Sequence, residues 1–203
     1  MRTEPYGAAT AGRSIDDATL IERSLRDPEA FAQLYDRHAP HIHRYVTRRL
    51  GAGAADDVVA DTFLDAFRQR GRYRSDRADA RPWLYGIAAN LIGRHRRAET
   101  RMLQACARAG IDPVAESYAD RVDDQVAAAA VRRPVARALA ALSPKYREVL
   151  LLIAWADLSY EETAEALGIS IGTVRSRLHR ARKKVREALG GQDPTSSIEE
   201  IGK

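Results

Sequence analysis

The highest density of residues that could take part in chemistry lies at 168–186, which reads GISIGTVRSRLHRARKKVR. Seven arginines and lysines fall within it, interleaved with an apolar stripe. On a helix, such cations would bind the phosphates of a nucleic acid while polar neighbours contact base edges. A solvated basic helix, packed by its other side, is the alternative. The elements before the stretch decide between the two.

The residues from 159 to 189 have the order of a helix-turn-helix. A capping box, SYEE at 159–162, begins a short helix, Gly168 ends it, and Ser170 begins a longer one. Apolar residues at 174, 178, 181 and 185 then share one face of the longer helix. Turn, caps and clustered charge together predict DNA binding. The residues expected to contact DNA are Ser170, Thr173, Arg175, Ser176, His179, Arg180 and Lys183.

A second group is acidic and lies on a helix expected to begin at Asp56 and to end near Arg70. Asp57, Asp61 and Asp65 are four residues apart, so they form a strip opposite the apolar face of that helix. A negative strip repels nucleic acid and favours a basic protein surface as its partner. Simple solubility is the alternative.

A third group combines a basic loop, GRYRSDRADARP at 71–82, with a helix expected from Pro82 to about Arg97. Cationic side chains beside an aromatic ring can hold single-stranded DNA and receive an unstacked base. We favour DNA contact over packing for Tyr73, and packing for Trp83 and Tyr85. Polar side chains on the outer face of the helix extend the group.

The remaining composition excludes several functions. The chain has 203 residues and a net charge of +5, and its one cysteine, Cys106, cannot form an intrachain disulfide. No apolar run is long enough to span a bilayer, and the first residues do not resemble a secretory signal. These features indicate a cytoplasmic protein. No nucleophile–base pair or phosphate-binding loop is evident, so no catalytic site and no cofactor are expected.

Three histidines, His38, His41 and His43, raise the question of a metal site. Pro40 lies between them, and no further ligand set completes their spacing. We therefore favour a partly buried or surface histidine group over a zinc site, and no metal is expected.

Helical periodicity runs through most of the chain, and no alternating strand pattern appears. The pattern weakens after residue 97 and resumes near Pro134. The sequence therefore predicts an all-α protein of two small helical domains joined by a flexible linker. The expected divisions are a disordered leader at 1–15, a first domain at 16–97, the linker at 98–133, a second domain at 134–190 and a tail at 191–203.

At these segments the chain resembles the extracytoplasmic-function (ECF) sigma factors of bacterial RNA polymerase. DDVVADTFLDAF at 56–67 is similar to the region 2 helix of that family that docks on the β′ clamp helices. The segment at 72–97 is similar to the part of region 2 that melts and reads the −10 element. LSPKYREVLLLIAWADLSYEETAEALGISIGTVRSRLHRARKKV at 142–185 is similar to region 4, which reads the −35 element.

The resemblance implies roles for particular residues. Core polymerase would contact Asp57, Asp61, Thr62 and Asp65, and the −10 strand would contact Arg72, Tyr73, Arg74, Asn90, Arg94 and Arg97. It also implies as partners core RNA polymerase, through its β′ clamp helices and β flap, promoter DNA, and an anti-sigma factor, with no membrane association. The charged loop SDRADARP departs from several relatives, which leaves the preferred −10 bases open.

Two other functions remain as alternatives. A conventional helix-turn-helix regulator would bind duplex DNA tightly by itself and would carry a ligand pocket in its first domain. A protein-interaction adaptor would use the basic helix to contact an acidic partner, independently of DNA.

Overall fold

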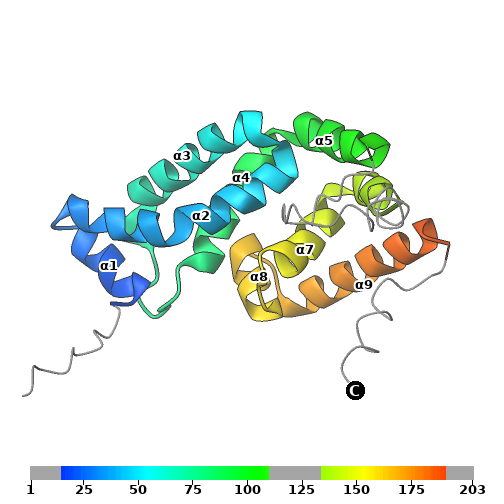
Figure 1. Ribbon diagram of the computed structural model, residues 1–203. Helices are drawn as coiled ribbons and strands as arrows, with labels where there is room; N and C mark the ends of the chain where they lie inside the picture. The colour runs from blue at the N-terminus through cyan, green and yellow to red at the C-terminus, as the bar shows by residue number, and fades with distance from the viewer. Residues whose placement is uncertain (1–14, 110–133, 191–203) are drawn as a thin grey trace, which may run out of the picture.

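The computed structural model describes residues 15–109 and 134–190, and within these ranges the regular elements are all helices (Figure 1). The expected tail, all but the last residue of the expected leader and most of the expected linker fall outside the described residues. Residues 134–141 are helical, and the other elements are α1 (Asp17–Ser24), η1 (Pro28–Ala30), α2 (Phe31–Leu50), α3 (Ala52–Gln69), η2 (Arg70–Arg72), α4 (Arg81–Arg94), α5 (Arg96–Ala109), α7 (Pro144–Trp155), α8 (Tyr160–Leu167) and α9 (Ile171–Ala188).

The N-terminal module, α1 to α5, is built around α2, α3 and α4, which pack on one another. The stripe of α2 supplies Leu34, Ile42 and Val46, all completely buried. Pro40 does not interrupt α2, which continues to Leu50. The next helix begins at Ala52 and not at Asp56 as expected, because Gly51 turns the chain sharply with a φ of 85°.

The C-terminal module, residues 134–190, contains the expected helix-turn-helix in α8 and α9. The capping box is present: the Ser159 amide donates to the Glu162 carboxylate at 2.7 Å, and the Glu162 amide donates to the Ser159 hydroxyl at 3.1 Å. Gly168 has the left-handed φ of 61° that the turn requires, and the Ser170 hydroxyl caps α9 by accepting from the Thr173 amide. A small core between α7, α8 and α9 holds this arrangement: Val149, Ala164, Val174 and Leu178.

The first third of the expected linker is instead helix α5, which runs to Ala109. Its buried face contains Glu99, Leu103 and Cys106. The sequence did not indicate a packed helix here, because a glutamate in the middle of its buried face disguises the apolar pattern. Cys106 belongs to a small buried cluster with Ala107 and Ala136, and so it contributes to the contact between α5 and residues 134–141.

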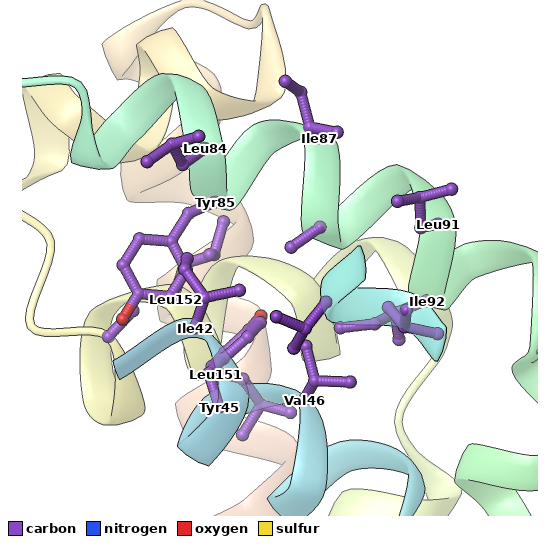
Figure 2. Packing of buried hydrophobic residues seen from close by; sticks show 14 of the residues in the cluster. Ile42, Tyr45, Val46, Leu84, Tyr85, Ile87, Leu91, Ile92, Leu151 and Leu152 are labelled. Carbon is purple, nitrogen blue, oxygen red and sulfur yellow. The ribbon is translucent and has the colours of Figure 1, made fainter. Parts of the chain in front are cut away.

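The two modules share a hydrophobic core in this structure. Leu151 and Leu152 of α7 are at most 1% exposed and belong to the same cluster as Ile42 and Tyr45 of α2 and Tyr85 of α4 (Figure 2). The contact extends to α8, which packs closely against α4. The modules that the sequence divides are therefore packed together. None of the described helices is long and apolar enough to cross a membrane.

Candidate nucleic-acid interface

The outer face of α9 presents the side chains that were expected to reach DNA. Ser170, Arg175, Ser176, His179, Arg180 and Lys183 are exposed and Thr173 is half-buried, while Val174, Leu178 and Ala181 lie beneath them. Because the apolar face is fixed by the module core, the polar and cationic face is held outward. The structure thus brings together all seven residues on one helix and its cap.

Local contacts order part of this face. The Ser176 hydroxyl donates to the carbonyl of Thr173 at 3.1 Å. Arg180 donates to the Tyr146 hydroxyl at 3.4 Å, and this hydrogen bond lowers the pKa of Tyr146. Lys183 lies 3.9 Å from Glu187, an exposed pair that contributes little to stability. Arg175 projects from the first turns of the helix, where a major-groove reader presents its base contacts.

The basic loop before α4 is folded around Tyr73. The Tyr73 hydroxyl donates to the carbonyl of Arg77 at 2.7 Å, and its ring packs against Trp83 with centroids 4.9 Å apart. Burial raises the pKa of Tyr73 above its ordinary value. In this structure the Tyr73 side chain is therefore packed within the module, which was the alternative to DNA contact. Its contact with DNA stays a prediction. Arg72 and Arg74 are exposed, and Arg74 pairs with Asp76 at 2.8 Å.

The outer face of α4 carries the rest of the expected −10 residues. Asn90 and Arg94 are exposed and line a cleft of about 450 Å³. Arg97 is exposed too but belongs to α5, because the expected single helix ends at Arg94, with a break at His95. Arg177 of α9 and Lys145 of α7 line the same cleft, so its walls come from both modules.

A buried hydrogen-bonded chain positions the start of α4. Asp17 accepts from the Ala80 amide at 2.9 Å and pairs with His38 at 2.8 Å. The second ring nitrogen of His38 is 2.8 Å from His41, whose other nitrogen is 3.1 Å from the Tyr85 hydroxyl. Two of the three histidines thus connect α1, α2 and α4. Among the described residues, no three histidine, cysteine or carboxylate side chains are grouped to hold a metal ion.

The pKa values of two groups in this hydrogen-bonded chain are shifted by their surroundings. Burial, reinforced by the positive charges of His38 and Arg81, lowers the pKa of His41 from 6.5 to about 4. Burial alone would raise the pKa of Asp17, but hydrogen bonds from His38 and the Ala80 amide lower it below its ordinary value. Sequence reasoning missed Asp17, and nothing in its spacing distinguishes it from other acidic residues near the N-terminus.

The acidic strip on α3 is present, with one correction. Asp57 and Asp61 are exposed, and Asp65 is half-buried at 3.8 Å from Arg68. Thr62 is completely buried, and its hydroxyl donates to the carbonyl of Val58 at 2.6 Å. The direct partner contact expected of Thr62 does not fit this position, because its side chain is turned into the module core.

An apolar surface beside the strip was missed. Leu64 is 44% exposed and lies three residues after Asp61, hence on the same side of α3. Tyr35 of α2 is 46% exposed and lines a groove of about 570 Å³ between α2 and α3, together with His43 and Asp56. An exposed leucine inside a charged helix face was the signal that could have found this surface.

Comparison with known proteins places both modules in one family. Residues 34–102 match sigma-70 region 2 and residues 132–185 match sigma-70 region 4. CarQ, an RNA polymerase sigma factor of Myxococcus xanthus, is 35% identical over 174 residues that cover 80% of this chain and 90% of CarQ. The ECF RNA polymerase sigma factor SigL of Mycobacterium tuberculosis is 36% identical over 157 residues, covering 77% and 86% of the two chains. The chain belongs to the ECF sigma factors.

Two solved structures are similar to this chain along most of its length. CnrH, in complex with the cytosolic domain of CnrY, has a TM-score of 0.59 and 27% identity, covering 87% of this chain and 99% of CnrH. RpoE, in complex with the anti-sigma factor NepR from Bartonella quintana, has a TM-score of 0.55 and 26% identity, covering 80% and 98%. As an ECF sigma factor, the chain binds RNA polymerase and promoter DNA and gives transcription initiation its promoter specificity. The regulator alternative is not favoured.

Proposed function

We propose that α9 reads the −35 element in the major groove. The observation that carries this assignment is the exposed row formed by Arg175, Ser176 and His179, fixed from below by the buried Val174 and Leu178. A helix held by its apolar face can enter the groove without reorganising its own module. Arginine can donate two hydrogen bonds to a guanine, and serine can bond to several bases, so this row can discriminate sequence.

The −10 element is assigned to the outer face of α4 and to the basic loop before it. Asn90 offers both a donor and an acceptor to an unstacked base, while Arg72, Arg74 and Arg94 supply charge for the phosphates. Tyr73 would contact the strand only after its ring leaves Trp83, since the two rings now pack together. Arg97 continues the charged path onto α5.

Core polymerase is assigned to α3. Asp57 and Asp61 are exposed beside Leu64, which combines negative charge with apolar area in the manner of a protein interface. The β′ clamp helices are the proposed partner of this surface, and the β flap that of the C-terminal module. The complex of RpoE with NepR also supports an anti-sigma factor as a partner of this chain. The chain itself would carry out no catalysis, and its place of action would be the cytoplasm.

Transcription from a promoter library tests these assignments. Core polymerase with the wild-type chain is supplied with templates randomised separately at −35 and at −10, and the transcribed sequences are counted. Arg175→Ala should change the selected bases at −35 only, and Asn90→Ala those at −10 only. An unchanged selection with either variant would refute that residue's role in base recognition.

A further inference from the structure

The last residues of the basic loop before α4 are held through their backbone, and the first residue of α1 supplies two of the contacts. The Asp17 amide donates to the carbonyl of Ala78 at 3.1 Å, and the Asp17 carboxylate accepts from the Ala80 amide at 2.9 Å. Asp17 is 3% exposed and Ala80 is completely buried. A buried amide that loses its acceptor has no water to replace it, so this hydrogen bond tolerates little displacement. Asp17 therefore fixes the place where the loop joins α4.

The carboxylate of Asp17 is itself held by two neighbouring residues of α2. His38 lies 2.8 Å from Oδ2, the oxygen that also accepts from the Ala80 amide. Arg37 donates to the other oxygen, Oδ1. His38 is buried, whereas the Arg37 side chain is 37% exposed. One oxygen thus connects α2 with the loop inside the module, while the other binds a partner at the surface.

Tyr73 makes a second, separate set of contacts to the same segment. Its hydroxyl lies 2.7 Å from the carbonyl oxygen of Arg77 and 3.2 Å from that of Asp79. If the Tyr73 ring moves out to meet an unstacked base, as proposed above, both of these contacts are lost. The contacts that Asp17 makes do not involve Tyr73, so they remain. The segment can therefore keep its shape while its aromatic side chain moves.

The position of residues 78–80 matters for the proposed −10 site, because the loop and α4 line a common cleft. Tyr73 and Arg74 of the loop and Asn90 of α4 are among the lining residues of this cleft, whose volume is about 330 Å³. Residues 78–80 connect its two sides along the chain. A shift of these residues would change the geometry offered to a base without removing any group that contacts the base.

We propose that Asp17 is a positioning residue for −10 recognition: its amide and carboxylate hold residues 78–80, so that the basic loop keeps one geometry toward α4 when DNA engages Tyr73. This inference rests on the −10 role proposed for α4 and the loop. It gives α1, a helix that carries none of the proposed DNA-contacting residues, a part in promoter selectivity.

Three variants separate the loop contact from the other contacts of the carboxylate. Asp17→Ala removes the acceptor of the Ala80 amide. Asp17→Asn can turn its amide oxygen toward Ala80 and His38, which leaves its NH2 group on the exposed side. There the Arg37 side chain can move into water. Arg37→Gln removes only the exposed partner of the carboxylate and is the matched control.

Amide hydrogen exchange of the full chain, followed by NMR at single residues, gives the first readout. Ala80 precedes the first turn of α4, where amides have no acceptor within the helix, so its protection depends on Asp17. Exchange at Ala80 should be slow in the wild type, Asp17→Asn and Arg37→Gln, and about tenfold faster or more in Asp17→Ala. The amide of Ala88, inside α4, should stay protected in all four proteins. Fast exchange at Ala80 in the wild type, or equal rates in the wild type and Asp17→Ala, would overturn the contact.

Base selection gives the second readout. Holoenzymes made with each variant transcribe the templates randomised at −10 and at −35. Asp17→Ala should lower the preference for the favoured −10 base about fivefold, the lower end of what one good base contact contributes, and should leave the selection at −35 unchanged. Asp17→Asn and Arg37→Gln should select the same bases as the wild type, although both lose the ion pair between residues 17 and 37.

Three results of the selection would contradict this role. Unchanged −10 selection by Asp17→Ala, beside a clear preference in the wild type, would overturn the positioning role alone. An equal loss in Asp17→Ala and Asp17→Asn would also overturn it, because the loss would then follow the charge of residue 17 and not its bond to the loop. A wild-type holoenzyme without any base preference at −10 would overturn the proposed function together with the inference.

Discussion

Arg49 of α2 and Glu148 of α7 face each other across the two modules, and each terminal guanidinium nitrogen donates a 2.9 Å hydrogen bond to one carboxylate oxygen. Burial alone would lower the pKa of Arg49, but the adjoining Tyr45, Glu148 and Glu99 raise it well above its ordinary value, so the buried arginine stays charged. Its positive charge is thus balanced by one carboxylate from each module, Glu99 and Glu148.

Removal of the Glu148 charge should weaken the folded chain. Glu148→Gln leaves Arg49 buried with a poorer acceptor, which should lower the free energy of unfolding by about 1–3 kcal/mol. Urea denaturation followed by circular dichroism measures the change. Glu161→Gln is the control, since Glu161 is exposed on α8 and such surface changes alter stability by about 0.5 kcal/mol or less. Equal losses in both variants would show that the ion pair between the modules contributes nothing.

Alanine substitutions at two arginines of α9 should weaken promoter binding in different ways. Arg175→Ala should weaken the binding of the holoenzyme to its promoter by about 1–3 kcal/mol in free energy. This loss should occur only on templates with the preferred −35 bases. Arg182→Ala, at an exposed position further along the same helix, should weaken binding uniformly across templates and reduce the salt slope by about one. Fluorescence anisotropy on matched and scrambled −35 duplexes separates the two. Uniform weakening by Arg175→Ala would reduce its role to phosphate contact.

Charge reversal on the acidic strip should weaken assembly with core polymerase. The double variant Asp57→Lys, Asp61→Lys places like charges opposite a basic partner, and we expect a loss of about 1–3 kcal/mol, roughly fivefold to 150-fold in affinity. Surface plasmon resonance with immobilised core measures it. Glu22→Lys makes the same charge change at an exposed position of α1, in the same module, and should leave core affinity intact. If both proteins bind like the wild type, the strip serves solubility only.

Local signals predicted much of the fold. The helix-turn-helix was foreseen because capping boxes and turn glycines act within a few residues, and Ser159, Glu162 and Gly168 do what their types favour. Helix α5 was missed because its buried face includes Glu99, which pairs with arginines 50 residues before and 48 residues after it. A partner so distant in the chain leaves no trace in a short window of sequence.

The site was predicted in part for the same reason. The outward face of α9 follows from its own periodicity, so six of the seven expected residues are exposed and Thr173 is half-buried, while their contact with DNA stays a prediction. Thr62 was assigned from the resemblance, whereas its spacing from Val58 and Val59 places it on the buried face of α3. The packing of α8 against α4 depends on one close backbone approach at Gly86, and a glycine within a helix does not by itself indicate such an approach.

Acid should destabilise the chain through His41. Its pKa is about 4 in the folded chain against 6.5 for the free side chain, so between these values the unfolded chain binds more protons and stability falls as pH falls. Above pH 6.5 both states are neutral at this position and the contribution is complete. From pH 7 to pH 5 the loss should be about 1 kcal/mol, once the partial exposure of His41 to solvent is allowed for.

Thermal unfolding at pH 7 and pH 5, at constant ionic strength, measures this loss. His41→Gln retains a polar side chain of similar reach that does not titrate, so its melting temperature should fall less between the two pH values than that of the wild type. His43→Gln is the control, because His43 is exposed and paired only with the exposed Asp56 and nearby Thr47 in the described contacts. An equal fall in wild type and His41→Gln would contradict the lowered pKa of His41, because it would mean that His41 is already protonated in the folded chain at pH 5.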